Sequence, residues 1–65
     1  MAPAEIRFAN GDTFVVEGEL EEVEKKLSDA ARSGQSRLAW FRELDSDEQI
    51  GVNPAHVASL RAAAE

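Results

Sequence analysis

The chain has 65 residues, of which thirteen are acidic and seven are basic, and its formal net charge is −6. A chain of this length forms one small domain, residues 1–65, whose ends at 1–4 and 62–65 we expect to fray. Because nucleic acids and anionic membranes attract Lys and Arg, the acidic balance disfavours nucleic acid as a partner and argues against membrane binding.

The supply of core-forming residues is smaller than the 43% hydrophobic fraction suggests. Eleven of these residues are alanine, and only sixteen larger apolar side chains remain besides Met1. A domain of this size buries about 60% of its unfolded surface, so burial barely outweighs the entropy of ordering the chain. Cysteine is absent, so neither a disulfide nor a cysteine-based zinc site adds stability. We therefore expect self-association, with a homodimer favoured.

Targeting signals are not evident in the sequence. No apolar run approaches the roughly 20 residues that span a bilayer, and residues 1–5 lack the basic start and apolar stretch of a signal peptide. We therefore expect a cytoplasmic protein. The excess of Arg over Lys and the many alanines suggest a GC-rich bacterial genome.

Asn10 and Gly11 separate two segments with alternating apolar residues, which predicts a β-hairpin. A two-residue loop would divide the apolar side chains between both faces of the hairpin. A three-residue loop, with Gly11 in the left-handed conformation, instead pairs Ile6 with Phe14 and gathers the apolar side chains on one face. We predict this loop, with a bulge. The residues that then share a face are Ile6, Phe8, Phe14 and Val16.

After Gly18 the apolar period changes from two to 3.6 residues, which predicts a helix over residues 19–33. Gly34 follows at the place where a C-terminal cap is expected. Favourable ion pairs at the i,i+4 spacing are expected between Glu21 and Lys25 and between Glu22 and Lys26.

Aromatic and β-branched residues predict two further strands, 36–44 and 48–53, joined through residues 45–47. Asn53 and Pro54 are typical of a helix N-cap with proline in the first position. After Pro54 the pattern allows either a short helix or a turn with a brief strand. The predicted fold class is α+β: a ββαββ antiparallel sheet with one helix packed across one face, plus a short C-terminal turn and strand or helix.

Trp40 and Phe41 are the most informative pair of residues. Adjacent residues of a strand point to opposite faces, so one of the two lies under the helix and the other on the open face of the sheet. Val15 and Ala39 would accompany Phe41 on the open face, whereas Val15 alone would accompany Trp40. The candidate interface with a second copy is Val15, Ala39, Trp40 and Phe41.

Acidic residues concentrate at the predicted start of the helix, where the helix dipole favours negative charge. The same cluster is a candidate docking patch for a basic protein partner. Its members are Glu17, Glu19, Glu21 and Glu22.

Nothing in the sequence predicts catalysis, a cofactor or a metal ion. His56 is the only histidine and has no recognisable nucleophile or orienting group, so we expect it to be an exposed or half-buried residue of the turn after Pro54. The acidic run of the second hairpin lacks the spacing of a calcium-binding loop and indicates a solvated loop. That run consists of Glu43, Asp45, Asp47 and Glu48.

Two segments resemble small bacterial proteins of the FlbD type. The first is IRFANGDTFVV at 6–16 followed by LEEV at 20–23, and the second is IGVNPAHV at 50–57. In that family the two pieces occur in the opposite order, so this chain would be a permuted relative or an analogue. The chain is also similar to uncharacterised small bacterial ββαββ proteins with the order found here. The resemblance implies a hairpin–helix–hairpin layout and an extended segment after Pro54.

The sequence therefore predicts a small cytoplasmic bacterial interaction or adaptor protein, not an enzyme, that self-associates through the open sheet face or an edge strand. The alternative is an accessory of a nucleic-acid or transcription system, which binds a basic regulator or weakly contacts nucleic acid. Three arginines would line one sheet face in that case, if the strand registers agree: Arg7, Arg37 and Arg42.

Overall fold

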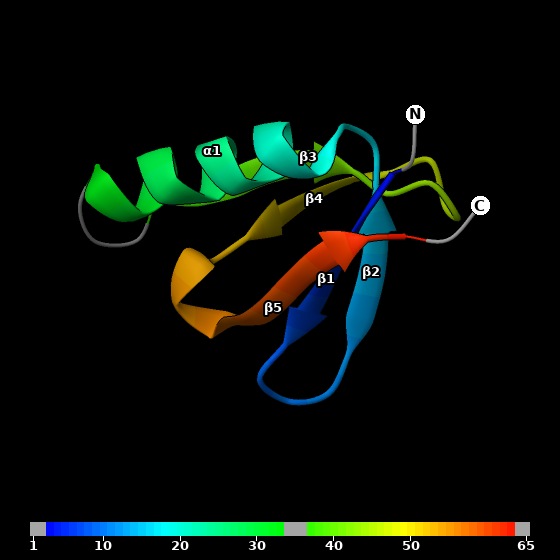
Figure 1. Cartoon of the computed structure of the whole chain (residues 1–65), viewed down its shortest axis with the longest axis horizontal. Coiled ribbons are helices and arrows are strands. Elements are labelled where there is room, and N and C mark those ends of the chain that lie inside the picture. The colour runs from blue at the N-terminus through cyan, green and yellow to red at the C-terminus, as the bar shows by residue number, and fades with distance from the viewer. Residues whose placement is uncertain (1–2, 34–36, 64–65) are drawn as a thin grey trace.

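A computed structural model describes residues 3–33 and 37–63 of the chain. Within these residues it contains one helix and five strands in antiparallel sheets, which confirms the predicted α+β class and ββαββ order (Figure 1). The elements in chain order are β1 (Ala4–Phe8), β2 (Thr13–Val16), α1 (Leu20–Arg32), β3 (Ala39–Arg42), β4 (Gln49–Val52), the short 3-10 helix η1 (Pro54–His56) and β5 (Val57–Ala62).

The first hairpin has the register that the apolar pattern predicts. Ile6 lies opposite Phe14, and the amide of Phe8 donates to the carbonyl of Asp12 at 2.8 Å. Gly11 has a φ of 99°, in the region that favours glycine. The three-residue loop is therefore confirmed.

The segment after Pro54 is a single helical turn followed by a strand. The Asn53 side chain accepts a hydrogen bond from the Ala55 amide at 2.9 Å, which caps η1 as predicted. β5 then pairs antiparallel with β1, so β1 is the central strand of the β2-β1-β5 sheet. Whether this segment forms a helix or a strand depends on its pairing with β1, which is distant in the sequence. The local pattern of residues does not contain this information.

The sequence predicts fraying at residues 1–4 and 62–65, and in the structure the described residues of these two segments lie beside each other. Ala4 is completely buried and lies opposite Ala62 in the β1–β5 pair. The Ala63 amide donates to the Pro3 carbonyl at 2.8 Å. The two terminal strands therefore hold each other in place, whereas residues 1–2 and 64–65 lie outside the described residues.

The second hairpin forms a sheet of its own, which corrects the prediction of a single sheet. β3 and β4 pair with each other, and β2 contacts them only through an isolated bridge between Val16 and Glu43. The physical reason is Gly18, whose φ of 113° turns the chain away from β2 into α1. β3 and β4 are also shorter than the predicted strands at 36–44 and 48–53. Ser36 lies outside the described residues.

Helix α1 matches the predicted range, with Glu19 as its N-cap and Ser33 as its C-cap. Gly34, the predicted cap residue, lies outside the described residues. Neither predicted i,i+4 ion pair is among the salt bridges between described residues. Lys26 instead donates to the Trp40 carbonyl at 3.2 Å, because β3 lies close beside this face of the helix.

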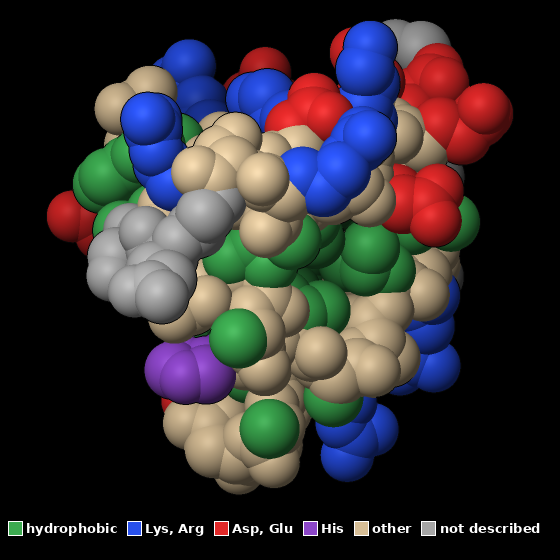
Figure 2. Space-filling view, turned by 90° about the vertical axis from the view of Figure 1, so that its left-hand side faces the viewer, with side chains coloured by type: hydrophobic (Ala, Val, Ile, Leu, Met, Phe, Trp, Pro, Cys, Tyr) green, Lys and Arg blue, Asp and Glu red, His purple; other side chains and the backbone are tan. Residues whose placement is uncertain are grey.

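The core lies between the helix and the inner faces of the two sheets. Partly buried residues, including Ala30, Val57 and Leu60, pack around it. Seen from the end of the molecule where α1 finishes, hydrophobic side chains reach the surface in a band below the helix (Figure 2). The core is therefore small and incompletely covered. Its buried members are Ala4, Ile6, Val16, Val23, Leu27, Ala39, Phe41 and Val52.

Candidate interaction surface

Two large exposed apolar side chains, Trp40 and Leu38, lie in β3 and directly before it, and a third, Leu44, lies in the loop after it and is 45% exposed. Trp40 is 55% exposed and Leu38 is 41% exposed. Phe41, the neighbour of Trp40 in β3, is buried in the core. The structure thus answers the question that the alternation left open: Trp40 faces outward and Phe41 faces inward.

The predicted interface residues consequently do not form one surface. Ala39 and Phe41 are core residues, only 5% and 4% exposed, so they are not accessible to a second copy. Val15 is half-buried in β2, opposite Glu5, and belongs to the other sheet. Packing determines which residues of β3 point inward, because Ala39 lies opposite Val52, which is itself buried. Of the predicted set, Trp40 alone lies on the outward face of this hairpin.

Gly51 explains the shape of this surface and adds a residue that sequence reasoning missed. It lies opposite Trp40 in the β3–β4 ladder. A Cβ atom at this position would come within 2.9 Å of Leu38 Cδ1 and 3.1 Å of Trp40 Cη2. The two side chains therefore rest on the bare backbone of Gly51. A glycine opposite an exposed tryptophan in a hairpin register is the sequence signal that could have identified them. We call Leu38, Trp40 and Gly51 the hairpin patch.

Charged groups surround the hairpin patch without occupying it. The Arg42 side chain forms ion pairs with Asp47 and, at 3.7 Å, with Glu17. The hydrogen bond from Arg42 to Asp47 raises the pKa of Arg42, and the negative charges of Asp47 and Glu17 act in the same direction. Arg42 therefore keeps its positive charge throughout the ordinary pH range and is partly neutralised by its neighbours.

The predicted acidic docking patch is largely engaged in local structure. Glu19 is the N-cap of α1, and its amide donates to Glu22 Oε1 at 3.2 Å. Glu17 forms the ion pair with Arg42, while Glu21 lies exposed in the first turn of the helix. At these positions the carboxylates interact favourably with the helix dipole, and few of them are left free for a basic partner.

The acidic loop between β3 and β4 is held by its own hydrogen bonds. The Ser46 hydroxyl donates to Glu43 Oε1 at 2.7 Å, and the Asp47 amide donates to the Glu43 carbonyl at 2.9 Å. Asp45 and Glu48 are exposed. In the part of the chain that the structure describes, no three His, Cys, Asp or Glu residues are grouped so that they could hold a metal ion.

His56 is exposed at the end of η1, in agreement with the prediction of an exposed or half-buried residue of the turn. The three arginines considered for nucleic acid lie on different elements. Arg7 is in β1 and Arg42 in β3, which belong to separate sheets, and Arg37 precedes β3. The predicted basic sheet face is therefore not formed.

Over residues 3–33 and 37–63, no helix has both the length and the apolar character that crossing a membrane requires.

Comparisons with known proteins identify no relative of this chain. No protein-family model matches the chain, and neither the curated proteins nor the solved structures gave a match. The resemblance to FlbD-type small proteins therefore stays a prediction.

Proposed function

We propose that this protein is a small interaction module that pairs with a second copy of itself through the outward face of the β3–β4 hairpin. The observation that supports this proposal is the exposure of Trp40 and Leu38 side by side over Gly51. An indole that is 55% exposed in a chain with so few large apolar residues is costly to leave in water.

A second copy is the occupant that fits this surface best. In a twofold-symmetric dimer each patch meets its own copy, so the interface must be self-complementary. An apolar centre satisfies this condition, whereas a patch of one charge would repel itself. The mixed charges of Arg42, Asp47 and Glu17 beside it allow opposite charges to meet across the axis.

The free edge of β4 supports the same arrangement. β4 is the end strand of its two-stranded sheet, so one row of its backbone groups lacks a strand partner among the described residues. Antiparallel pairing of β4 with its copy would satisfy these groups and bring the two hairpin patches together on one continuous sheet. The dimer would then serve as an adaptor in the cytoplasm of a bacterium, the setting that its composition suggests.

Sedimentation equilibrium across micromolar concentrations tests this proposal. We expect the wild-type chain to sediment as a dimer, and Trp40→Gln to shift it to monomer, because the substitution removes the largest apolar side chain of the hairpin patch. Thr13→Gln is the matched control, since Thr13 is exposed on the other sheet. A wild-type monomer at all concentrations, or equal weakening by both variants, would contradict the proposal.

A further inference from the structure

Among the residues that the structure describes, the edge of β3 that faces away from β4 is paired with a strand only near its end. The Glu43 amide donates to the Glu48 carbonyl at 2.8 Å. By the alternation of an antiparallel ladder, the backbone groups of Trp40 and Arg42 therefore point away from β4. The Arg42 carbonyl accepts from the Glu17 amide of the β2 side at 2.9 Å. One further step along the edge leads to the Trp40 carbonyl.

At Trp40 a side chain takes the place of a strand. If β2 continued, the next amide to face Trp40 would be that of Glu19. The chain turns at Gly18 instead, and the Glu19 amide donates to Glu22 within the helix. The Trp40 carbonyl accepts from the ammonium of Lys26 at 3.2 Å. Lys26 thus spans the space between α1 and β3, and its ammonium lies 5.3 Å from the centre of the Phe41 ring.

This space is a groove that continues on both sides of Lys26. On the side towards the end of α1 there is a cavity of about 340 Å³, lined by small residues such as Ala30 and Ala39 together with Arg37. On the side towards Gly18 there is a hollow of about 460 Å³. Lys26 and Trp40 line both. The groove therefore follows the free edge of β3.

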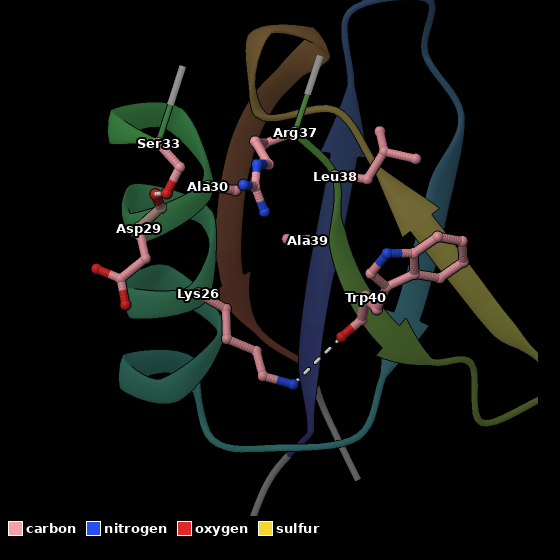
Figure 3. Close-up of a pocket in the computed structure, with 8 residues that line it drawn as sticks. All are labelled: Lys26, Asp29, Ala30, Ser33, Arg37, Leu38, Ala39 and Trp40. Atoms are coloured by element: carbon pink, nitrogen blue, oxygen red, sulfur yellow. Dashed lines mark hydrogen bonds between the residues drawn. The ribbon is translucent and has the colours of Figure 1, made fainter. Parts of the chain in front are cut away.

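The two ends of the groove differ in charge. Figure 3 shows the guanidinium of Arg37 and the ammonium of Lys26 directed into the space between α1 and β3, whereas the carboxylate of Asp29 points away from it. Asp29 forms an ion pair with Arg32 at 3.3 Å. The hollow near Gly18 is lined by Glu17 and Glu22 together with Arg42, which forms an ion pair with Glu17. The Arg37 end is thus a local positive site in a chain of net charge −6.

We propose that this groove binds an extended acidic peptide segment, which adds a strand to the free edge of β3. A peptide amide would replace Lys26 as the donor to the Trp40 carbonyl, which is the hydrogen-bonding mode of strand addition. A carboxylate side chain of the peptide would lie between Arg37 and the released ammonium of Lys26. The groove follows the edge of β3 that faces away from β4, whereas the proposed dimer uses the free edge of β4. The two sites share the side chains of Leu38 and Trp40, which also line the groove.

Amide NMR titration with synthetic peptides tests the site. The probe is a short peptide of alternating valine and aspartate, capped at both ends, and the matched peptide carries lysine in place of aspartate. We expect saturable shifts at Lys26 and at residues 37–42 with the aspartate peptide only. Methylation of the probe's backbone nitrogens should abolish these shifts, because it removes the donors and keeps the side chains.

Substitution at one end of the groove gives the matched control. Arg37→Gln should weaken the aspartate peptide about two- to fivefold, the effect of losing one exposed ion pair. Arg32→Gln should leave the affinity unchanged, because Arg32 pairs with Asp29 and does not line the groove. Equal binding of the lysine peptide, binding of the methylated peptide, shifts confined to β4 or β5, or no saturable binding would each overturn the proposal.

Discussion

Two glycines of this chain are subject to different physical constraints. Gly11 has a φ of 99° and open space where a Cβ would lie, so a side chain there would strain the backbone without touching a neighbour. Gly51 does not have a positive φ, but a Cβ would lie 2.9 Å from Leu38 Cδ1. The first is a constraint of the turn, and the second is a constraint of the hairpin patch.

Alanine at each position should separate the two constraints. Gly11→Ala should lower the free energy of unfolding by about 1–2 kcal/mol, because the left-handed conformation is unfavourable for alanine. Gly51→Ala should change it by less than about 1 kcal/mol, since a stiffer strand offsets the displacement of two mobile side chains. Urea denaturation measures both. The emission of Trp40 should shift in Gly51→Ala and stay unchanged in Gly11→Ala; the reverse pattern would contradict the packing described.

The start of helix α1 shows how acidic residues act at the scale of an element. Glu22 accepts a hydrogen bond from the Glu19 amide and lies in the first turn, near the positive end of the helix dipole. Glu24 is exposed two residues further along the helix, beyond the first turn. Both carry the same charge, and only their positions in the helix differ.

Glu22→Ala should therefore destabilise the protein by about 0.5–1 kcal/mol, through loss of the capping bond and of the interaction with the dipole. Glu24→Ala should have almost no effect, because alanine favours the helix interior and no cap is lost. Thermal unfolding of the two variants, monitored by circular dichroism, checks the difference. Equal losses would mean that the acidic residues act through net charge alone.

The elements that could be predicted are those whose signals are local. The loop at Gly11 and the helix after Gly18 follow from spacing over a few residues, and both were confirmed. The strand after Pro54 depends on pairing with β1. The outward orientation of Trp40 depends on its neighbours Ala39 and Phe41, which are buried in the core. Such contacts join distant parts of the chain, so alternation could restrict the choices but could not select between them.

The groove could not be predicted for the same reason. Its existence follows from the departure of β2 at Gly18, which leaves the Trp40 carbonyl to Lys26. The i,i+4 rule assigned Lys26 to Glu22, because that rule considers the helix in isolation. Once β3 lies beside the helix, a carbonyl at a free strand edge competes for the ammonium and accepts its hydrogen bond.

At the scale of the whole molecule, two small sheets share one thin core. Among residues 3–33 and 37–63, eight are buried, and two of these are alanine. The sheets are joined by a single bridge at Val16 and by the helix that packs on both. A monomer of this kind has stability at the low end of the usual range, so burial of Trp40 and Leu38 against a second copy would add a substantial fraction of it.

Self-association should therefore make stability depend on concentration, because mass action favours the folded dimer. Each tenfold rise in protein concentration adds about 1.4 kcal/mol to a two-state unfolding dimer. With the small denaturant dependence of a chain this short, the urea midpoint should rise by roughly 0.5–1 M per decade. Trp40→Gln should unfold at a lower midpoint that does not change with concentration, whereas Thr13→Gln should behave as wild type. A wild-type midpoint that stays constant over two decades would show that the monomer folds alone and would contradict the proposed dimer.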